Sequence, residues 1–222
     1  MTAPEKPFLI AVDGPAASGK GTIAEGLARF YGYPCLDSGL LYRAVGAAVL
    51  AGGGDLDDIE AASAAARALT ARQLEDPALR TREAGEAASR VAVHVPVRAA
   101  LLDFQRAFAA QSPGAVVDGR DIGTVIAPWA PAKLFVTATP EVRATRRWRQ
   151  LEGQGQSVPY ADILADIRKR DERDSGRAAS PLTMAADAVL LDTTEMTIEQ
   201  AADAARRIVE AARGRWEQSL PG

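Results

Sequence analysis

Short apolar runs alternate with longer amphipathic stretches along this chain, which predicts strands separated by helices. The apolar runs have continuous hydrophobic centres, as strands of a parallel sheet do when helices cover both faces. Five such runs occur, at residues 8–12, 34–37, 115–117, 133–138 and 188–191. Strands and helices in this order predict an α/β fold with a doubly wound, five-stranded parallel sheet.

The intervening stretches have helical periodicity. A helix is predicted over 40–50, where three glycines at 52–54 end it. Residues 56–110 are alanine-rich and helical in period, with breaks expected near Asp76-Pro77 and at Pro96. The last predicted helix, over 198–216, has an apolar face formed by Ile198, Ala202, Ala205, Ile208, Val209 and Ala212.

A glycine-rich loop joins the first apolar run to the following helix. Its residues are Gly14, Pro15, Ala16, Ala17, Ser18, Gly19, Lys20, Gly21 and Thr22. A strand, then a glycine-rich loop that ends in Gly-Lys, then a helix is the arrangement found in a P-loop. The backbone N–H groups of such a loop and the N-terminus of its helix bind polyphosphate. Lys20 would reach the terminal phosphates, and it is one of only four lysines against 22 arginines. The alternative is a turn that binds nothing.

The hydroxyl of this loop is displaced by one position from the common pattern. Gly21 follows the lysine, and the hydroxyl comes at Thr22. Whether Thr22 would contact Mg²⁺ directly or through water stays open.

Polar residues follow two other predicted strands. Asp37 and Ser38 follow the second strand, and 118–121 follows the third. Ligands of open α/β sheets bind at the carboxyl ends of the strands, so one site is expected there. Ser38 is expected to cap the next helix, with Arg43 about a turn and a half further on.

Eight arginines lie between Arg143 and Arg177, in two predicted helices joined by a glycine-containing segment at 153–157. Arg170, Asp174 and Arg177 are spaced i, i+4 and i+7, which places them on one helix face. A solvated charged helix would explain this density. Beside a P-loop, a hinged arginine lid that neutralises a moving phosphoryl group and excludes water is the stronger interpretation.

Composition excludes several other classes. A net charge of −3 does not favour nucleic-acid binding, and no run approaches the about 18 apolar residues of a membrane span. One cysteine, Cys35, and one histidine, His94, cannot form a zinc site. We expect Cys35 to pack in a strand and His94 to be hydrogen-bonded or at the surface. A cytoplasmic location and a monomer are the expectations.

Four motifs resemble those of the bacterial cytidylate kinases. They are Gly-Lys-Gly-Thr at 19–22, Asp-Ser-Gly-x-x-Tyr-Arg at 37–43, Gly-Arg-Asp-Ile-Gly-Thr-Val at 119–125 and Lys-Arg-Asp-x-Arg-Asp-x-x-Arg at 169–177. The resemblance runs from about 8 to 213. It implies ATP-dependent phosphorylation of CMP and dCMP, with Mg²⁺ accompanying ATP.

The resemblance also implies roles for individual residues. Residues 14–22 would hold ATP, and the catalytic residues would be Lys20, Arg120, Arg170 and Arg177. Cytosine would be recognised by Ser89, Arg98 and Asp121, although Asp121 could instead be a structural partner of Arg120. The monophosphate's ribose and phosphate would be bound by Ser38, Arg43, Arg120, Arg170, Asp174 and Arg177.

The implied organisation is a single P-loop kinase domain over 1–222, with a helical monophosphate-binding insert at 39–110 and a lid at 149–177. The family usually carries short strands in the insert, whereas residues 56–92 here read as helical and shortened.

Two alternatives compete with this interpretation. One is a P-loop kinase for another nucleoside monophosphate or for a small metabolite, as in the shikimate kinases, and the motifs at 37–43 and 120–121 argue against it. The other is a P-loop switch that acts through a partner protein, and ADP formation only in the presence of a monophosphate would distinguish it from a kinase.

Overall fold

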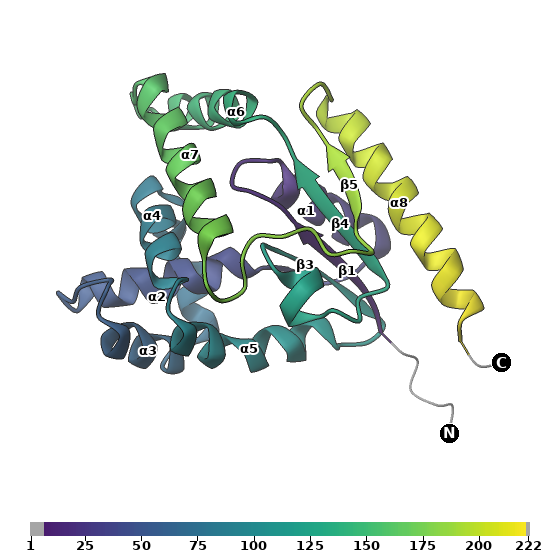
Figure 1. Cartoon of the computed structure of the whole chain (residues 1–222), viewed down its shortest axis with the longest axis horizontal. Coiled ribbons are helices and arrows are strands. Elements are labelled where there is room, and N and C mark those ends of the chain that lie inside the picture. The colour runs from purple at the N-terminus through teal and green to yellow at the C-terminus, as the bar shows by residue number, and fades with distance from the viewer. Residues whose placement is uncertain (1–6, 221–222) are drawn as a thin grey trace.

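A computed structural model describes residues 7–220 and has a five-stranded, fully parallel sheet (Figure 1). The strand order is β2-β3-β1-β4-β5. The strands are β1 (Phe8–Asp13), β2 (Cys35–Asp37), β3 (Gly114–Gly119), β4 (Ala132–Thr137) and β5 (Val189–Asp192). The predicted doubly wound α/β fold is confirmed, and each predicted strand is found within two residues of its expected bounds.

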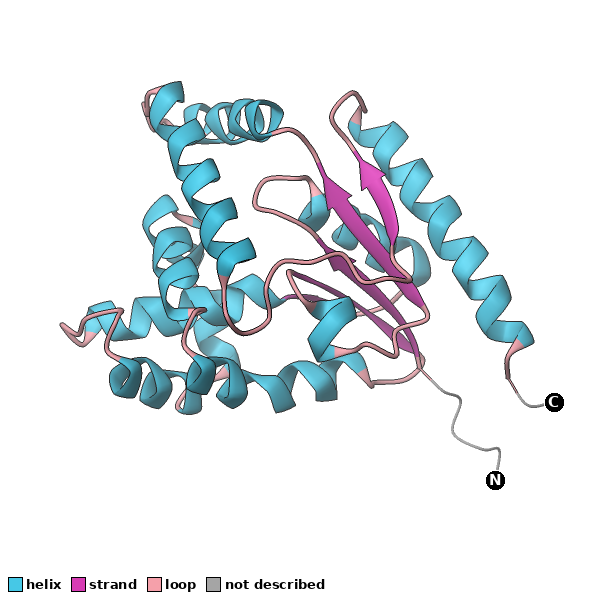
Figure 2. Cartoon of the chain, viewed as in Figure 1, coloured by secondary structure: helices cyan, strands magenta, loops and turns pink. Residues whose placement is uncertain are grey.

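Helices connect the strands (Figure 2). Those next to the sheet are α1 (Lys20–Tyr31), α2 (Ser38–Ala51), α5 (Val95–Ala109) and α8 (Ile198–Gln218), with a short π-helix η3 (Ile122–Ile126) after β3. The others are α3 (Ile59–Arg67), the 3₁₀ turns η1 (Ala71–Glu75) and η2 (Pro77–Arg80), α4 (Arg82–Val91), α6 (Pro140–Gly153) and α7 (Tyr160–Gly176). A break was expected at Pro96. The proline lies in the first turn of α5, where its missing N–H costs nothing, so the chain is interrupted just before α5 begins at Val95.

Alternate residues of the central strand β1 face two separate cores. Phe8, Ile10 and Val12 pack with α1 and α8, whereas Leu9 and Ala11 pack with residues of α5 and η3. Burial on both sides explains why this strand is continuously apolar in sequence.

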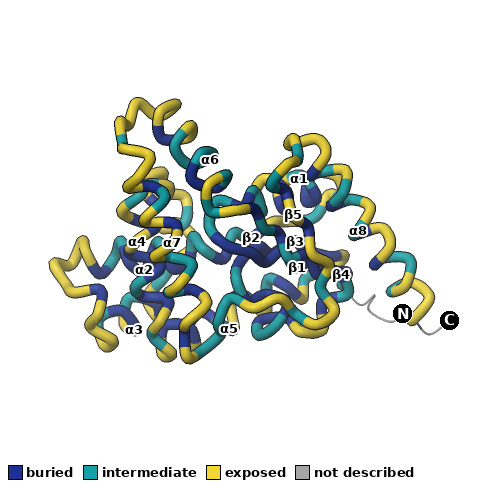
Figure 3. Tube along the Cα trace, turned by 45° about the horizontal axis from the view of Figure 1, so that its top comes forward, coloured by how far each residue is buried: buried dark blue, intermediate teal, exposed yellow. Residues whose placement is uncertain are grey.

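Two further apolar cores lie outside the sheet. One joins α2, α3, α4 and α5, and a small one joins α6 and α7. The described residues 56–92 contain helices and 3₁₀ turns and no strand. Figure 3 shows the buried segments gathered in the strands and between the helices, while the tip between α6 and α7 is exposed.

Three local expectations were wrong. Asp37, not Ser38, caps α2, because its carboxylate accepts the Gly39 N–H at 2.9 Å. Ile198 is 70% exposed, because it starts α8 before the part that packs on the sheet, whose buried residues begin at Ala201. Cys35 is exposed, because β2 is an edge strand.

His94 is half-buried and bonded through Nε2 to the Leu56 carbonyl at 2.9 Å, as expected of a hydrogen-bonded histidine. Among residues 7–220, no helix has the length and apolar composition that crossing a membrane requires.

Candidate active site

The loop between β1 and α1 has the backbone of a phosphate-binding turn. Gly14 has φ 151°, and a Cβ there would lie 1.9 Å from the Val136 carbonyl oxygen of β4. Gly19 has φ 90° and Ala17 has φ 60°, so the chain turns sharply before α1 begins at Lys20. These positive φ values curl the backbone at a helix N-terminus, the geometry that binds anions.

Lys20 lies beside the carboxyl ends of β2 and β3. Its Nζ is 3.5 Å from Asp118 Oδ2, and Asp118 is the register neighbour of Asp37. Burial lowers the pKa of Lys20, and Arg120 lowers it further. Burial raises the pKa of Asp118 to about 6, against the attraction of Lys20.

The two neighbouring carboxylates fit a magnesium ion that arrives with a nucleotide. Mg²⁺ uses one or two carboxylates and completes its shell with water and phosphate oxygens. In the described part of the chain, no cluster of three or more acidic, histidine or cysteine residues could hold a metal ion. Thr22 is exposed on α1.

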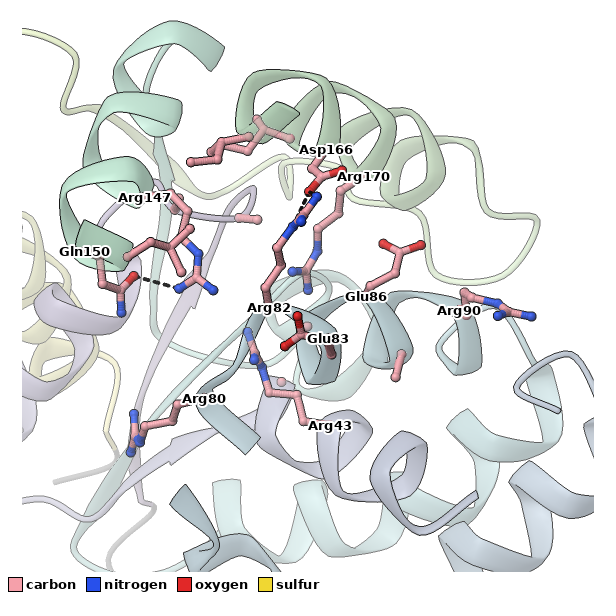
Figure 4. A pocket seen from close by; sticks show the side chains of 18 of the residues that line it. Arg43, Arg80, Arg82, Glu83, Glu86, Arg90, Arg147, Gln150, Asp166 and Arg170 are labelled. Carbon is pink, nitrogen blue, oxygen red and sulfur yellow. Dashed lines mark hydrogen bonds and ion pairs between the residues drawn. The ribbon is translucent and has the colours of Figure 1, made fainter. Parts of the chain in front are cut away.

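A cavity of about 660 Å³ opens beside the loop, between helices α2 and α4 on one side and helices α6 and α7 on the other. Figure 4 shows Arg43 of α2, Arg82 of α4 and Arg170 of α7 directed into it, with Arg147 of α6 on another wall. Of the residues expected to bind ligands, its lining includes Ala16, Ala17, Lys20, Arg43, Arg120 and Arg170. The arginines in this lining carry positive charge, which suits a phosphorylated ligand.

Arg43 and Arg170 meet over a glycine. Arg43 Nη1 donates to the carbonyls of Leu79 and Thr81 at 2.7 and 3.0 Å. A Cβ on Gly85 of α4 would lie 3.3 Å from Arg43 Nη2 and 3.5 Å from Arg170 Nη1. The small residue therefore leaves room for both guanidinium groups.

A buried cluster of charges lies behind this wall. Asp174 of α7 accepts a hydrogen bond from Arg120 Nε at 2.9 Å, and Arg170 Nε is 3.9 Å away. Burial opposes ionisation of Asp174, but Arg120, Arg170 and Arg177 outweigh it and hold its pKa below the ordinary value. Burial and Arg120 lower the pKa of Arg170 to about 10.

The residues expected to recognise cytosine are also buried. Arg98 of α5 forms an ion pair with Asp121, and its guanidinium lies 5.5 Å from the centre of the Tyr42 ring. Arg120 pairs with Asp174, so the salt-bridge partner of Asp121 is Arg98. Six of the nine residues expected to bind the monophosphate are buried and do not line the cavity: Ser38, Ser89, Arg98, Asp121, Asp174 and Arg177.

Several buried polar atoms lack a hydrogen-bond partner within residues 7–220. They belong to Ser18, Ser89, Arg98, Thr124, Arg170 and Arg177. All but Thr124 were singled out by the sequence, and Thr124 lies in the motif at 119–125. Buried donors are normally satisfied, so these atoms are available to hydrogen-bond a polar ligand.

Comparison with known proteins decides the family. The cytidylate kinase family model matches residues 10–211. The chain belongs to the cytidylate kinase family. It is 70% identical over 209 residues to the cytidylate kinase of Caulobacter sp. strain K31, covering 94% of this chain and 97% of that one. It is 65% identical over 206 residues to the cytidylate kinase of Xanthobacter autotrophicus, covering 93% and 99%.

This membership makes the protein a kinase. A gluconokinase from Sinorhizobium meliloti 1021 shares the fold, with a TM-score of 0.52 and 18% sequence identity over 97% of this chain and 99% of that structure.

Three arginines of α6 that the sequence did not single out lie at the P-loop or the cavity. Arg143 Nη1 donates to the Ala16 carbonyl at 3.2 Å, and Arg146 Nη1 donates to the Ser18 carbonyl at 3.3 Å. Arg147 lines the cavity. All three lie in the arginine-rich segment, but the sequence did not indicate which of its arginines face the loop.

Two surface ion pairs across the cavity were also missed, because their partners are distant in sequence. Arg82 of α4 pairs with Asp166 of α7, and Glu86 of α4 pairs with Arg173 of α7. They join α4 to α7.

Proposed function

We propose that this kinase transfers the γ-phosphoryl group of ATP directly to CMP and dCMP, giving CDP and dCDP. ATP binds on residues 14–22, and Lys20 contacts its terminal phosphates. The acceptor phosphate lies among Arg43, Arg120 and Arg170, with Arg177 joining when the lid closes.

The observation that carries this proposal is the set of buried donors without partners in the described chain. Arg170 and Arg177 keep unpaired guanidinium N–H groups beside Asp174. Such groups cost free energy in the unliganded protein, and a phosphate dianion satisfies them two at a time. Ser38 and Asp174 complete this subsite by holding the ribose.

Cytosine presents an amino donor beside two acceptors on one edge. Asp121 accepts from the amino group, and Arg98 and Ser89 donate to the ring acceptors. The unpaired Arg98 Nε and Ser89 Oγ among residues 7–220 support this assignment. The base enters by rearranging the Arg98–Asp121 pair.

No general base is required, because the acceptor phosphate, with a second pKa of about 6, is already largely ionised at neutral pH. Catalysis is therefore positioning and charge neutralisation by Lys20, Arg120, Arg170 and Arg177. Asp118 and Asp37 are the residues that would hold Mg²⁺, directly or through water. When bound, the ion neutralises charge on the ATP phosphates.

We further propose that residues 1–222 act as one monomeric domain, with 39–110 as the monophosphate-binding insert and 149–177 as the lid. Light scattering of the protein with and without CMP tests the monomer.

The decisive test is a coupled assay of ADP formation with Mg-ATP and CMP, dCMP, UMP, AMP, GMP or shikimate in turn. Rapid turnover with CMP and dCMP alone is expected. Turnover with another acceptor would overturn the roles of Arg98 and Asp121 but keep a P-loop kinase. ADP formation that depends on no acceptor would instead favour a P-loop switch.

A further inference from the structure

The P-loop carbonyls are held from the lid side by arginines of α6. Arg143 donates to the Ala16 carbonyl, and Arg146 and the Thr193 hydroxyl both donate to the Ser18 carbonyl, the latter at 3.1 Å. Figure 1 shows the loop between β1 and α1 near the start of α6. The backbone of the loop is thus fixed by side chains far away in sequence.

Fixing a carbonyl also fixes the next N–H group. In a trans peptide the C=O and N–H bonds point in opposite directions. With the Ala16 and Ser18 carbonyls turned to α6, the N–H groups of Ala17 and Gly19 are directed away from it. A phosphate in the loop needs those N–H groups.

Arg143 is itself held rigidly. Its Nε donates to the Ala138 carbonyl at 2.9 Å, and its Nη atoms pair with both oxygens of Asp171 at 2.9 and 2.5 Å. The residue is 3% exposed. A planar guanidinium can make all these bonds at once, whereas a lysine ammonium cannot reproduce the fork.

The lid also touches the loop through apolar contacts. Ala17 packs against the small core of α6 and α7, whose buried members are Ala144, Leu151, Ile163 and Ile167. Asp171 is the neighbour of Arg170 on α7. The helix that carries the acceptor-binding arginines is therefore attached to the loop through Arg143.

We infer that Arg143, held by Asp171, is a positioning residue that sets the direction of the P-loop N–H groups and thereby the affinity for ATP. The inference rests on the proposed function only in taking ATP as the P-loop ligand. Arg143 acts through the loop backbone and is not itself a catalytic residue.

The test is calorimetric titration with the non-hydrolysable β,γ-imido analogue of ATP, with MgCl₂ and without CMP. Arg143→Lys and Asp171→Asn are each expected to weaken binding about tenfold, the loss for one charge-assisted hydrogen bond. CMP alone should bind each variant within about twofold of wild type. Asp171→Glu, which keeps the carboxylate, should recover part of the ATP affinity.

Glu141→Gln is the matched control. It removes another ion pair between α6 and α7, with Arg168, that does not contact the loop. Its ATP affinity should match wild type. Amide resonances of Ala17 and Gly19 should shift in unliganded Arg143→Lys and not in Glu141→Gln.

Wild-type affinity for the analogue in both Arg143→Lys and Asp171→Asn, with their folding checked by thermal melting, would overturn the inference. Equal losses of ATP and CMP affinity would also overturn it, because they would indicate general damage to the lid. A wild-type protein that binds the analogue but does not phosphorylate CMP would refute the proposed function alone.

Discussion

Asp174 of helix α7 accepts a hydrogen bond from Arg120 Nε, 2.9 Å away at the end of strand β3. The carboxylate is 5% exposed and also faces Arg170. This buried contact fixes α7 against the sheet, and it balances positive charges that would otherwise repel one another.

Replacing Asp174 with Asn should therefore destabilise the protein by about 3 kcal/mol or more, since it leaves buried arginines without a counter-charge. Urea unfolding measures the loss. Asp166→Asn on the same helix is the control, because its ion pair with Arg82 is half exposed and should contribute no more than about 1 kcal/mol. Equal losses in the two variants would contradict this account.

Arg177→Ala should behave in the opposite way. Two nitrogens of Arg177, Nε and Nη2, are buried without a partner in the described residues, so its removal should cost little stability. Turnover with CMP should fall by about 10³ or more, as for other arginines that stabilise a phosphoryl-transfer transition state. Steady-state kinetics and thermal melting measure the two effects. Arg168→Ala, at an exposed position of α7, is the control and should keep its turnover. Normal turnover in Arg177→Ala would remove this residue from the mechanism.

Gly14→Ala should prevent normal folding of the loop. Its Cβ would lie 1.9 Å from the Val136 carbonyl oxygen, and φ is 151°. The strained backbone should lower the free energy of unfolding by about 1–3 kcal/mol. The displacement of β4 should lower it by about 1–3 kcal/mol more. Gly214→Ala in α8 has nothing within 4 Å of the added Cβ and should stabilise the helix by up to about 1 kcal/mol. Urea unfolding of both variants tests the pair, and a folded, wild-type-like Gly14→Ala would contradict the close approach.

The stability should depend on pH through Asp118. Burial raises the pKa of this carboxyl to about 6, so between about pH 4 and 6 the folded state keeps a proton that the unfolded state has lost. Folding is therefore favoured as the pH falls through this window. As the pH falls from 7 to 4, the free energy of unfolding of the wild-type protein should rise by up to about 3 kcal/mol relative to that of Asp118→Asn.

Urea unfolding of wild type and Asp118→Asn at several pH values measures that difference. A constant difference would mean that Asp118 titrates normally. At pH 8 the Asn variant should keep its fold, because burying the Asp118 carboxylate costs stability. It should lose activity, because that carboxylate is expected to face the magnesium ion.

Local patterns in the sequence determined the strands, the P-loop and the helical spacing of Arg170 and Asp174. Each depends on neighbouring residues: an apolar run buried on both faces, glycines where φ is positive, or one helix turn. The family could be recognised for the same reason, since its motifs are short and contiguous. Aspartate and serine can both cap a helix N-terminus, so the sequence could not show which of two adjacent residues does so. In the structure Asp37 caps α2 in place of Ser38.

Only the tertiary structure decided which charged groups meet. Asp121 pairs with Arg98 instead of Arg120, and Arg143 reaches the Ala16 carbonyl across 127 residues. An arginine side chain is long and can donate to acceptors on several elements, so its partner depends on how the helices pack and not on spacing along the chain. The same packing buries Arg98 beside Asp121, and Arg170 and Arg177 beside Asp174.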